Sequence, residues 1–190
     1  RHMIPFKYQT FNGQIGAIKR ETYHSVGGYN KKIRWGMDYE NEEFGRRILK
    51  EHNLYLDPNF QVRHNFPNFS KLTKTYFTRV SSWILIFMSD LKFETGGPAS
   101  MNSGLSILSL LFSLISLIFA LFVSDTFYIL ALFLFIIWLR AYISFFTYVY
   151  NTKPRFIIIS ILFNIWFSLV LGLGAIWGLI RWLRGERVLT

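Results

Sequence analysis

Residues 103–123 form a run of 21 residues without a single charged side chain. At the helical rise of 1.5 Å per residue, such a run is long enough to cross the ~30 Å hydrocarbon core of a bilayer. Two further apolar segments, 127–150 and 156–180, follow after short polar connections. Region 103–190 is therefore predicted to be an all-α transmembrane region with about three spans.

The charge distribution separates this region from the rest of the chain. Residues 1–102 hold 15 Lys/Arg and 9 Asp/Glu, whereas residues 103–190 hold 6 Lys/Arg and 2 Asp/Glu. We interpret 1–69 as a polar head, whose basic balance suits anionic membrane lipids and a phosphate-bearing ligand. No basic run interleaved with aromatics stands apart, so the sequence predicts no nucleic-acid partner. The chain has no cysteine, which excludes disulfides and thiolate metal sites.

Residues 70–93 are patterned as an amphipathic helix. Apolar and aromatic side chains recur at helical spacing, while Lys71, Lys74, Arg79 and Lys92 lie mostly on the other side. A basic helix with an aromatic face is typical of helices that lie in the membrane interface, and the alternative is a core helix of a soluble domain. We expect 70–102 to comprise this interfacial helix and a linker.

The predicted topology contains a conflict. With the head in the cytoplasm, the basic loop 151–155 lies inside, as the positive-inside rule requires. Three crossings then place the arginine-rich C-terminus outside, so either one apolar segment does not cross or the tail departs from the rule. Arg140 lies well inside the second predicted span, where a charge costs about 2.5–3.5 kcal/mol. It could pair with the phosphate of a lipid-linked acceptor, snorkel, or end a shorter span.

The head is predicted to mix strands and helices. Segment 13–19 has the small and apolar alternation of a buried strand, and 20–26 is a short helix ended by Gly27-Gly28 in left-handed geometry. Asp38 is a suitable N-cap for the next helix, whose first turns are acidic. Short strands are predicted at 54–56 and 60–64.

Carboxylates gather at the start of this second predicted helix. Asp38, Glu40 and Glu43 follow a tryptophan and a glycine turn, and Glu43 and Arg47 are four residues apart. One interpretation is a helix start with surface ion pairs, each worth about 0.2–0.5 kcal/mol. The other is a catalytic site.

The order of features in 12–64 resembles the C-terminal half of the catalytic domain of family 2 glycosyltransferases, which have the GT-A fold. The segments that carry this resemblance are GAIKRETYHSVGGYN, WGMDYENEEFGRRI and LYLDPNFQVRH. It implies a partial α/β GT-A-like catalytic domain in 1–69, followed by the interfacial helix and the transmembrane region. It further implies transfer of a sugar from a nucleotide-sugar donor to a polysaccharide or polyprenyl-linked acceptor. The protein would be multi-pass in the cell membrane, with its catalytic part in the cytoplasm.

The acidic motif of the family maps onto Glu40-Asn41-Glu42-Glu43, so Asn41 stands where the usual aspartate would be. An amide cannot act as a base. A Glu-Asn form is similar to the WGGEN-type motif of polypeptide N-acetylgalactosaminyltransferases, a retaining family on a related fold, so inversion or retention stays open. The resemblance implies Glu40 as the first candidate for the catalytic base and Asp38 as the second.

Other roles follow from the resemblance by position. Gly13 and Gln14 would lie against the donor sugar, and Trp35 and Gly36 would line the acceptor site beside Asn41 and Glu43. Arg47 would either pair with Glu43 or bind a ligand. His64 would help to bind a metal ion with the nucleotide diphosphate, and the alternative for His64 is a structural role.

The resembling enzymes bind the nucleotide through an N-terminal half with an Asp-x-Asp metal motif, which this sequence does not contain. A divalent metal (Mn or Mg) would be held mainly by that half. We therefore expect this chain to be a C-terminal portion of the enzyme, or an intact chain that has lost nucleotide binding, and to be inactive alone. The rival hypothesis is a non-enzymatic membrane assembly or transport subunit with a binding head.

Overall fold

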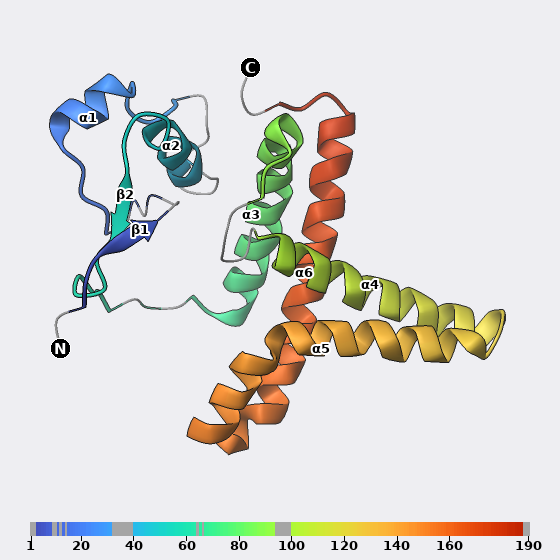
Figure 1. Ribbon diagram of the computed structural model, residues 1–190. Coiled ribbons are helices and arrows are strands. Elements are labelled where there is room, and N and C mark those ends of the chain that lie inside the picture. Colours follow the sequence, from blue (N-terminus) through green and yellow to red (C-terminus); the bar gives the residue numbers. More distant parts are fainter. Residues whose placement is uncertain are drawn as a thin grey trace.

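The computed structural model describes residues 3–8, 11, 13, 15–31, 40–63, 65, 67–93 and 100–187. Helices dominate these residues, and Figure 1 shows a small head beside a larger helical part. The elements in chain order are β1 (Phe6–Tyr8), α1 (Arg20–Ser25), α2 (Glu40–Ile48), β2 (Leu54–Leu56), α3 (Phe69–Asp90), α4 (Met101–Phe122), α5 (Thr126–Thr152), η1 (Pro154–Phe156) and α6 (Ile157–Leu183).

The predicted α/β GT-A-like domain is wrong. Within the described residues, the head has two three-residue strands that pair antiparallel in one sheet, with Phe6 opposite Leu56 and Tyr8 opposite Leu54. Residues 13 and 15–19, predicted as a buried strand, form a turn and irregular backbone, and 60–63 are also irregular. A strand needs a neighbour to satisfy its N–H and C=O groups, and the described residues provide none for these segments.

The predicted helices of the head are present. α1 ends at Ser25, and Gly27 and Gly28 follow with φ of +78° and +65°, the left-handed geometry that glycine accepts. α2 packs Phe44 and Ile48 on Phe11, and the rings of Phe11 and Phe44 meet edge-to-face at 5.3 Å. This small core holds α2 in place, and the rest of the head packs around that helix.

α4 and α5 form an antiparallel hairpin. Serines line the buried face of α4, and their small side chains let α5 approach closely. Ser113 donates to the carbonyl of Ala131 at 2.8 Å, and the rings of Phe119 and Phe127 lie 5.4 Å apart near the tip. The two helices therefore pack along each other from the tip of the hairpin to the level at which the start of α4 faces the middle of α5.

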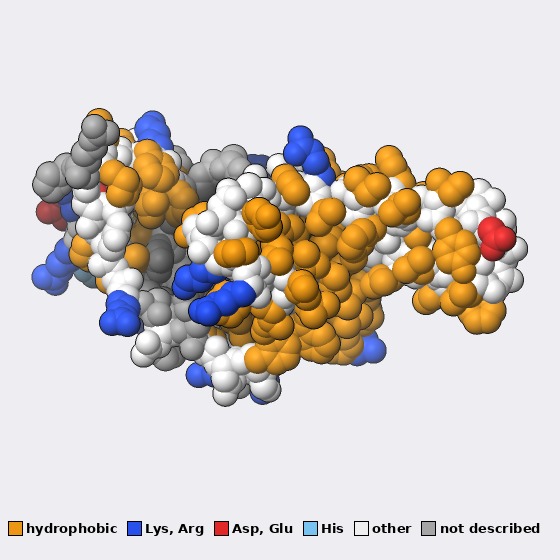
Figure 2. All heavy atoms as spheres, turned by 90° about the horizontal axis from the view of Figure 1, so that it is seen from below, with side chains coloured by type: hydrophobic (Ala, Val, Ile, Leu, Met, Phe, Trp, Pro, Cys, Tyr) orange, Lys and Arg blue, Asp and Glu red, His pale blue; other side chains and the backbone are white. Residues whose placement is uncertain are grey.

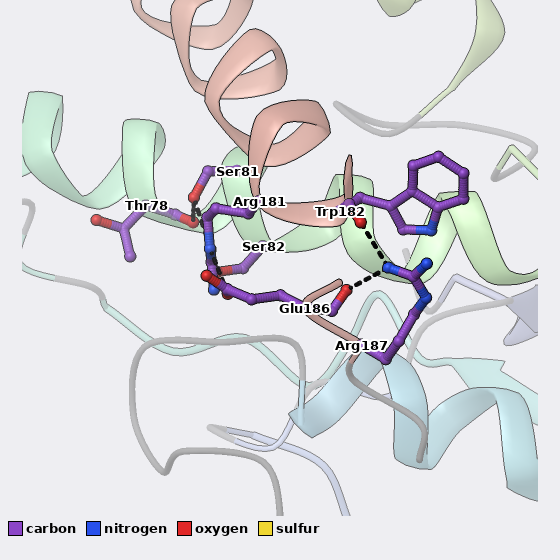
Figure 3. Close-up of polar contacts among 7 residues, drawn as sticks. All are labelled: Thr78, Ser81, Ser82, Arg181, Trp182, Glu186 and Arg187. Carbon is purple, nitrogen blue, oxygen red and sulfur yellow. Dashed lines mark hydrogen bonds and ion pairs between the residues drawn. The ribbon is translucent and has the colours of Figure 1, made fainter. Parts of the chain in front are cut away.

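α3 and α6 run side by side in the same direction (Figure 1). The backbone of α3 packs directly on two glycines of α6. A Cβ added to Gly174 would come within 2.8 Å of the Phe77 carbonyl oxygen, and a Cβ added to Gly178 would overlap the Ser81 carbonyl oxygen. At the end of α6, Arg181 donates to the hydroxyls of Ser81 and Ser82 (3.2 and 3.1 Å) and pairs with Glu186, as Figure 3 shows. These two glycines, four residues apart, thus let α3 and α6 pack closely.

The hairpin of α4 and α5 runs across the pair of α3 and α6 in Figure 1. Trp138 of α5, fully buried, donates from its indole nitrogen to Ser168 of α6 at 3.0 Å and ties the two pairs together. α4, α5 and the segment Pro154–Leu183 are each long and apolar enough to cross a membrane. Figure 2 shows hydrophobic side chains over most of this helical part. The protein is a membrane protein.

The arginine-rich end of α6 lies toward the head. Arg181 contacts Ser81 and Ser82, while Arg79, close by on α3, pairs with Glu42 of α2 at 2.8 Å. The head and the end of α6 therefore meet the same part of α3.

Candidate functional site

Arg47 fastens the glycine turn to α2. Its guanidinium pairs with Glu43 through two bonds, Nε to Oε1 at 2.6 Å and Nη2 to Oε2 at 2.9 Å. It also donates to the carbonyl of Gly28 at 2.6 Å and to that of Val26. Glu43 is buried, with 7% of its surface exposed. The predicted pair of Glu43 and Arg47 is present, and its geometry fits a structural clamp.

Gly13 and Asn41, two residues of the predicted set, lie side by side. A Cβ on Gly13 would overlap the side-chain oxygen of Asn41 and would lie 2.9 Å from the Tyr29 hydroxyl oxygen. Tyr29 donates to that same Asn41 oxygen at 3.0 Å. Glycine at position 13 thus leaves space for a short hydrogen-bonded contact between the turn after α1 and the first turn of α2.

Tyr29 is the residue of this site that sequence reasoning missed. Its ring packs on Phe44 with centroids 4.5 Å apart. Burial raises the pKa of the Tyr29 hydroxyl, and the nearby Glu40 carboxylate and Tyr23 add to the shift. The hydroxyl therefore stays a donor at neutral pH. An aromatic directly after Gly27-Gly28 was the available signal.

The three carboxylates in the first turn of α2 have different partners. Glu43 is held by Arg47, and Glu42 is held by Arg79. Glu40 makes no hydrogen bond or ion pair within the described part of the chain, although its Oε2 atom is buried. Arg79 was predicted on the basic side of its helix, opposite the apolar face, and its pairing with Glu42 connects α3 to the head.

Several predicted site residues lie outside the described residues. They are Gln14, Trp35, Gly36, Asp38 and His64. Of the predicted set, the structure brings together Gly13, Glu40 and Asn41 around Tyr29, and Glu43 with Arg47 behind them. No group of three or more metal-ligating side chains occurs in the part of the chain that the structure describes.

The fold and this cluster define a helical membrane protein with a small, tightly clamped polar head. No family model, curated protein or solved structure matches this chain. The assignment to glycosyltransferases therefore stays a prediction that rests on the order of motifs in the sequence.

Proposed function

We propose that this protein takes part in sugar transfer at a membrane surface, from a nucleotide-sugar to a polysaccharide or polyprenyl-linked acceptor. The observation that carries the proposal is the difference among the three carboxylates of α2. Arginines neutralise Glu42 and Glu43, whereas Glu40 has no partner among the described residues. A carboxylate that is kept unpaired beside two paired ones is suited to accept a proton.

Glu40 would act as the general base. In an inverting transfer, the acceptor hydroxyl gives its proton to the Glu40 carboxylate while its oxygen attacks the anomeric carbon. The new glycosidic bond forms as the bond from that carbon to the nucleotide phosphate breaks, and the nucleoside diphosphate leaves. Asp38, the second candidate for the base, lies outside the described residues.

The neighbours of Glu40 would position the acceptor. The Asn41 amide oxygen is already held by Tyr29, so the amide nitrogen stays directed for a second bond. Arg47 would act indirectly, by fixing the Gly27-Gly28 turn that carries Tyr29. A divalent metal ion, if the transfer uses one, would be held mainly by an N-terminal half of the enzyme.

The membrane helices and the distribution of charge support a location for this activity. Basic residues outnumber acidic ones in the head and at the end of α6, which favours the cytoplasmic face of the cell membrane. There the head would meet soluble nucleotide-sugars on one side and membrane-bound acceptors on the other.

The test compares Glu40→Gln with Glu51→Gln in the full-length protein. Glu51 is an exposed carboxylate just after α2 and is the matched control. Release of nucleoside diphosphate and labelling of the acceptor are measured over a panel of nucleotide-sugars. We expect Glu40→Gln to lower the rate by about 100-fold or more, at unchanged unfolding temperature, and Glu51→Gln to leave it unchanged.

Equal rates for Glu40→Gln and the unsubstituted protein would contradict the role of Glu40. Absence of transfer with every donor would favour the alternative, a non-enzymatic membrane assembly or transport subunit whose head only binds.

A further inference from the structure

We propose that a hollow between α4 and α5 binds the phosphate group of an anionic membrane lipid. The hollow has a volume of about 450 Å³ and lies where the first turns of α4 face the middle of α5. Its lining combines a cation, an amide, hydroxyls and apolar side chains: Asn102, Ser103, Leu105, Ser106, Ile137, Arg140, Ala141 and Tyr142. This site is separate from the cluster in the head.

Arg140 supplies the positive charge. Its side chain is exposed at the hollow and makes no ion pair or hydrogen bond within the described part of the chain. The acidic residues in 100–187 are Asp125 and Glu186. Asp125 is about 22 Å away along α5, and Glu186 is paired with Arg181 at 2.8 Å. A cation on an apolar helix without a protein carboxylate calls for an anion from outside the chain.

The alignment of the hairpin places Arg140 at a different depth from the one that the sequence indicated. Ser113 bonds to Ala131, and continuing this alignment sets Arg140 opposite Ser103 at the start of α4. From Ser103 to Phe122, α4 rises about 29 Å, which is close to the thickness of the hydrocarbon core. If the hairpin crosses the bilayer, Arg140 therefore lies at the headgroup level rather than at its centre.

The rest of the lining suits a lipid phosphate. The guanidinium of Arg140 forms strong, charge-assisted bonds with phosphate oxygens, and the amide of Asn102 and the hydroxyl of Tyr142 lie on the same hollow. The first turn of α4 adds the positive end of a 22-residue helix. Leu105 and Ile137, both exposed, provide an apolar wall for acyl chains. Inorganic phosphate has no acyl chains, so contact with this apolar wall would not strengthen its binding.

The test measures binding of fluorescent phosphatidylglycerol to the protein in a neutral detergent, with phosphatidylcholine as the comparison lipid. We expect Arg140→Gln to weaken phosphatidylglycerol binding by about tenfold or more. Arg155→Gln is the matched control, because Arg155 lies in η1 over the ring of Phe156, away from the hollow, and it should change binding less than about twofold.

Ala141→Phe is a second variant that keeps the charge. Ala141 is exposed at the hollow, so a phenyl ring there fills the space without disturbing the helix contacts, and binding should fall as with Arg140→Gln. Unchanged binding in both variants, or equal losses in Arg155→Gln and Arg140→Gln, would overturn the proposal. Displacement of the lipid by millimolar inorganic phosphate would overturn its assignment to a lipid.

Discussion

Arg47 and Glu43 lie one turn apart on α2 and form a two-bond ion pair, while the same guanidinium holds the carbonyls of Val26 and Gly28. One side chain thus connects the helix that carries the candidate base to the turn that carries Tyr29.

Replacement of Arg47 by alanine should destabilise the head. Glu43 would remain buried without a counter-ion, and the loss of one partner of such a pair costs about 3 kcal/mol. Hydrogen exchange of the α1 and α2 amides, followed by mass spectrometry, should show faster opening. Lys50→Ala, at an exposed position, is the control, and equal protection in the two variants would contradict the clamp.

The raised pKa of Tyr29 predicts a loss of stability in alkaline solution. Because the folded protein holds the phenolic proton more tightly than the unfolded chain, this contribution is complete below pH 10.0, the ordinary value for tyrosine. It is lost as the pH rises from there through the folded-state pKa. Tyr29→Phe should show a flatter fall in the free energy of unfolding over this range, and identical slopes would refute the assignment.

Gly178→Ala should separate α3 from α6. The added Cβ overlaps the carbonyl oxygen of Ser81, a backbone atom that cannot rotate away, and we expect a cost of about 1–3 kcal/mol. Gly104→Ala is the matched control in a neighbouring helix, since among the described residues its Cβ meets only the Phe93 ring, at 3.4 Å. Thermal unfolding in detergent measures both, and a Gly178→Ala protein as stable as the control would exclude this close packing.

Ser168→Ala should loosen the contact between α5 and α6. The Trp138 indole N–H would lose its acceptor, which costs about 1 kcal/mol for a bond between membrane helices. In a Trp138→Phe background, the same substitution should have almost no further effect. Ser144→Ala, on the exposed face of α5, serves as the control. Additive losses in the double variant would show that the two side chains are not coupled.

The helices could be predicted from the sequence because their signals are local. The segments 103–123, 127–150 and 156–180 match α4, α5 and α6 within a few residues at most ends, since length and apolarity alone define them. The helix predicted over 70–93 is α3, and Asn68 caps it by accepting from the Lys71 amide. The left-handed Gly27-Gly28 turn was likewise predictable from glycine itself.

Pairing between distant segments could not be predicted. β1 was not among the predicted strands, because Phe6–Tyr8 becomes a strand only when Leu54–Leu56 lies beside it. Segment 13–19 has the composition of a strand, yet its role in the described residues is to bring Gly13 against Asn41. In the site, the pair of Glu43 and Arg47 followed from helical spacing, whereas the Tyr29 contact depends on how the turn after α1 meets the first turn of α2.

The contact between α3 and α6 has a consequence for the order of events during synthesis. Arg181 and Ser82 are 99 residues apart, and the chain between them contains the whole hairpin. At a translation rate of about 5–20 residues per second, several seconds pass between the synthesis of α3 and that of α6, the helix whose glycines pack against it. During that interval the aromatic face of α3 has to be covered by lipid or by a chaperone, so α3 can pack fully only after α6 has been made.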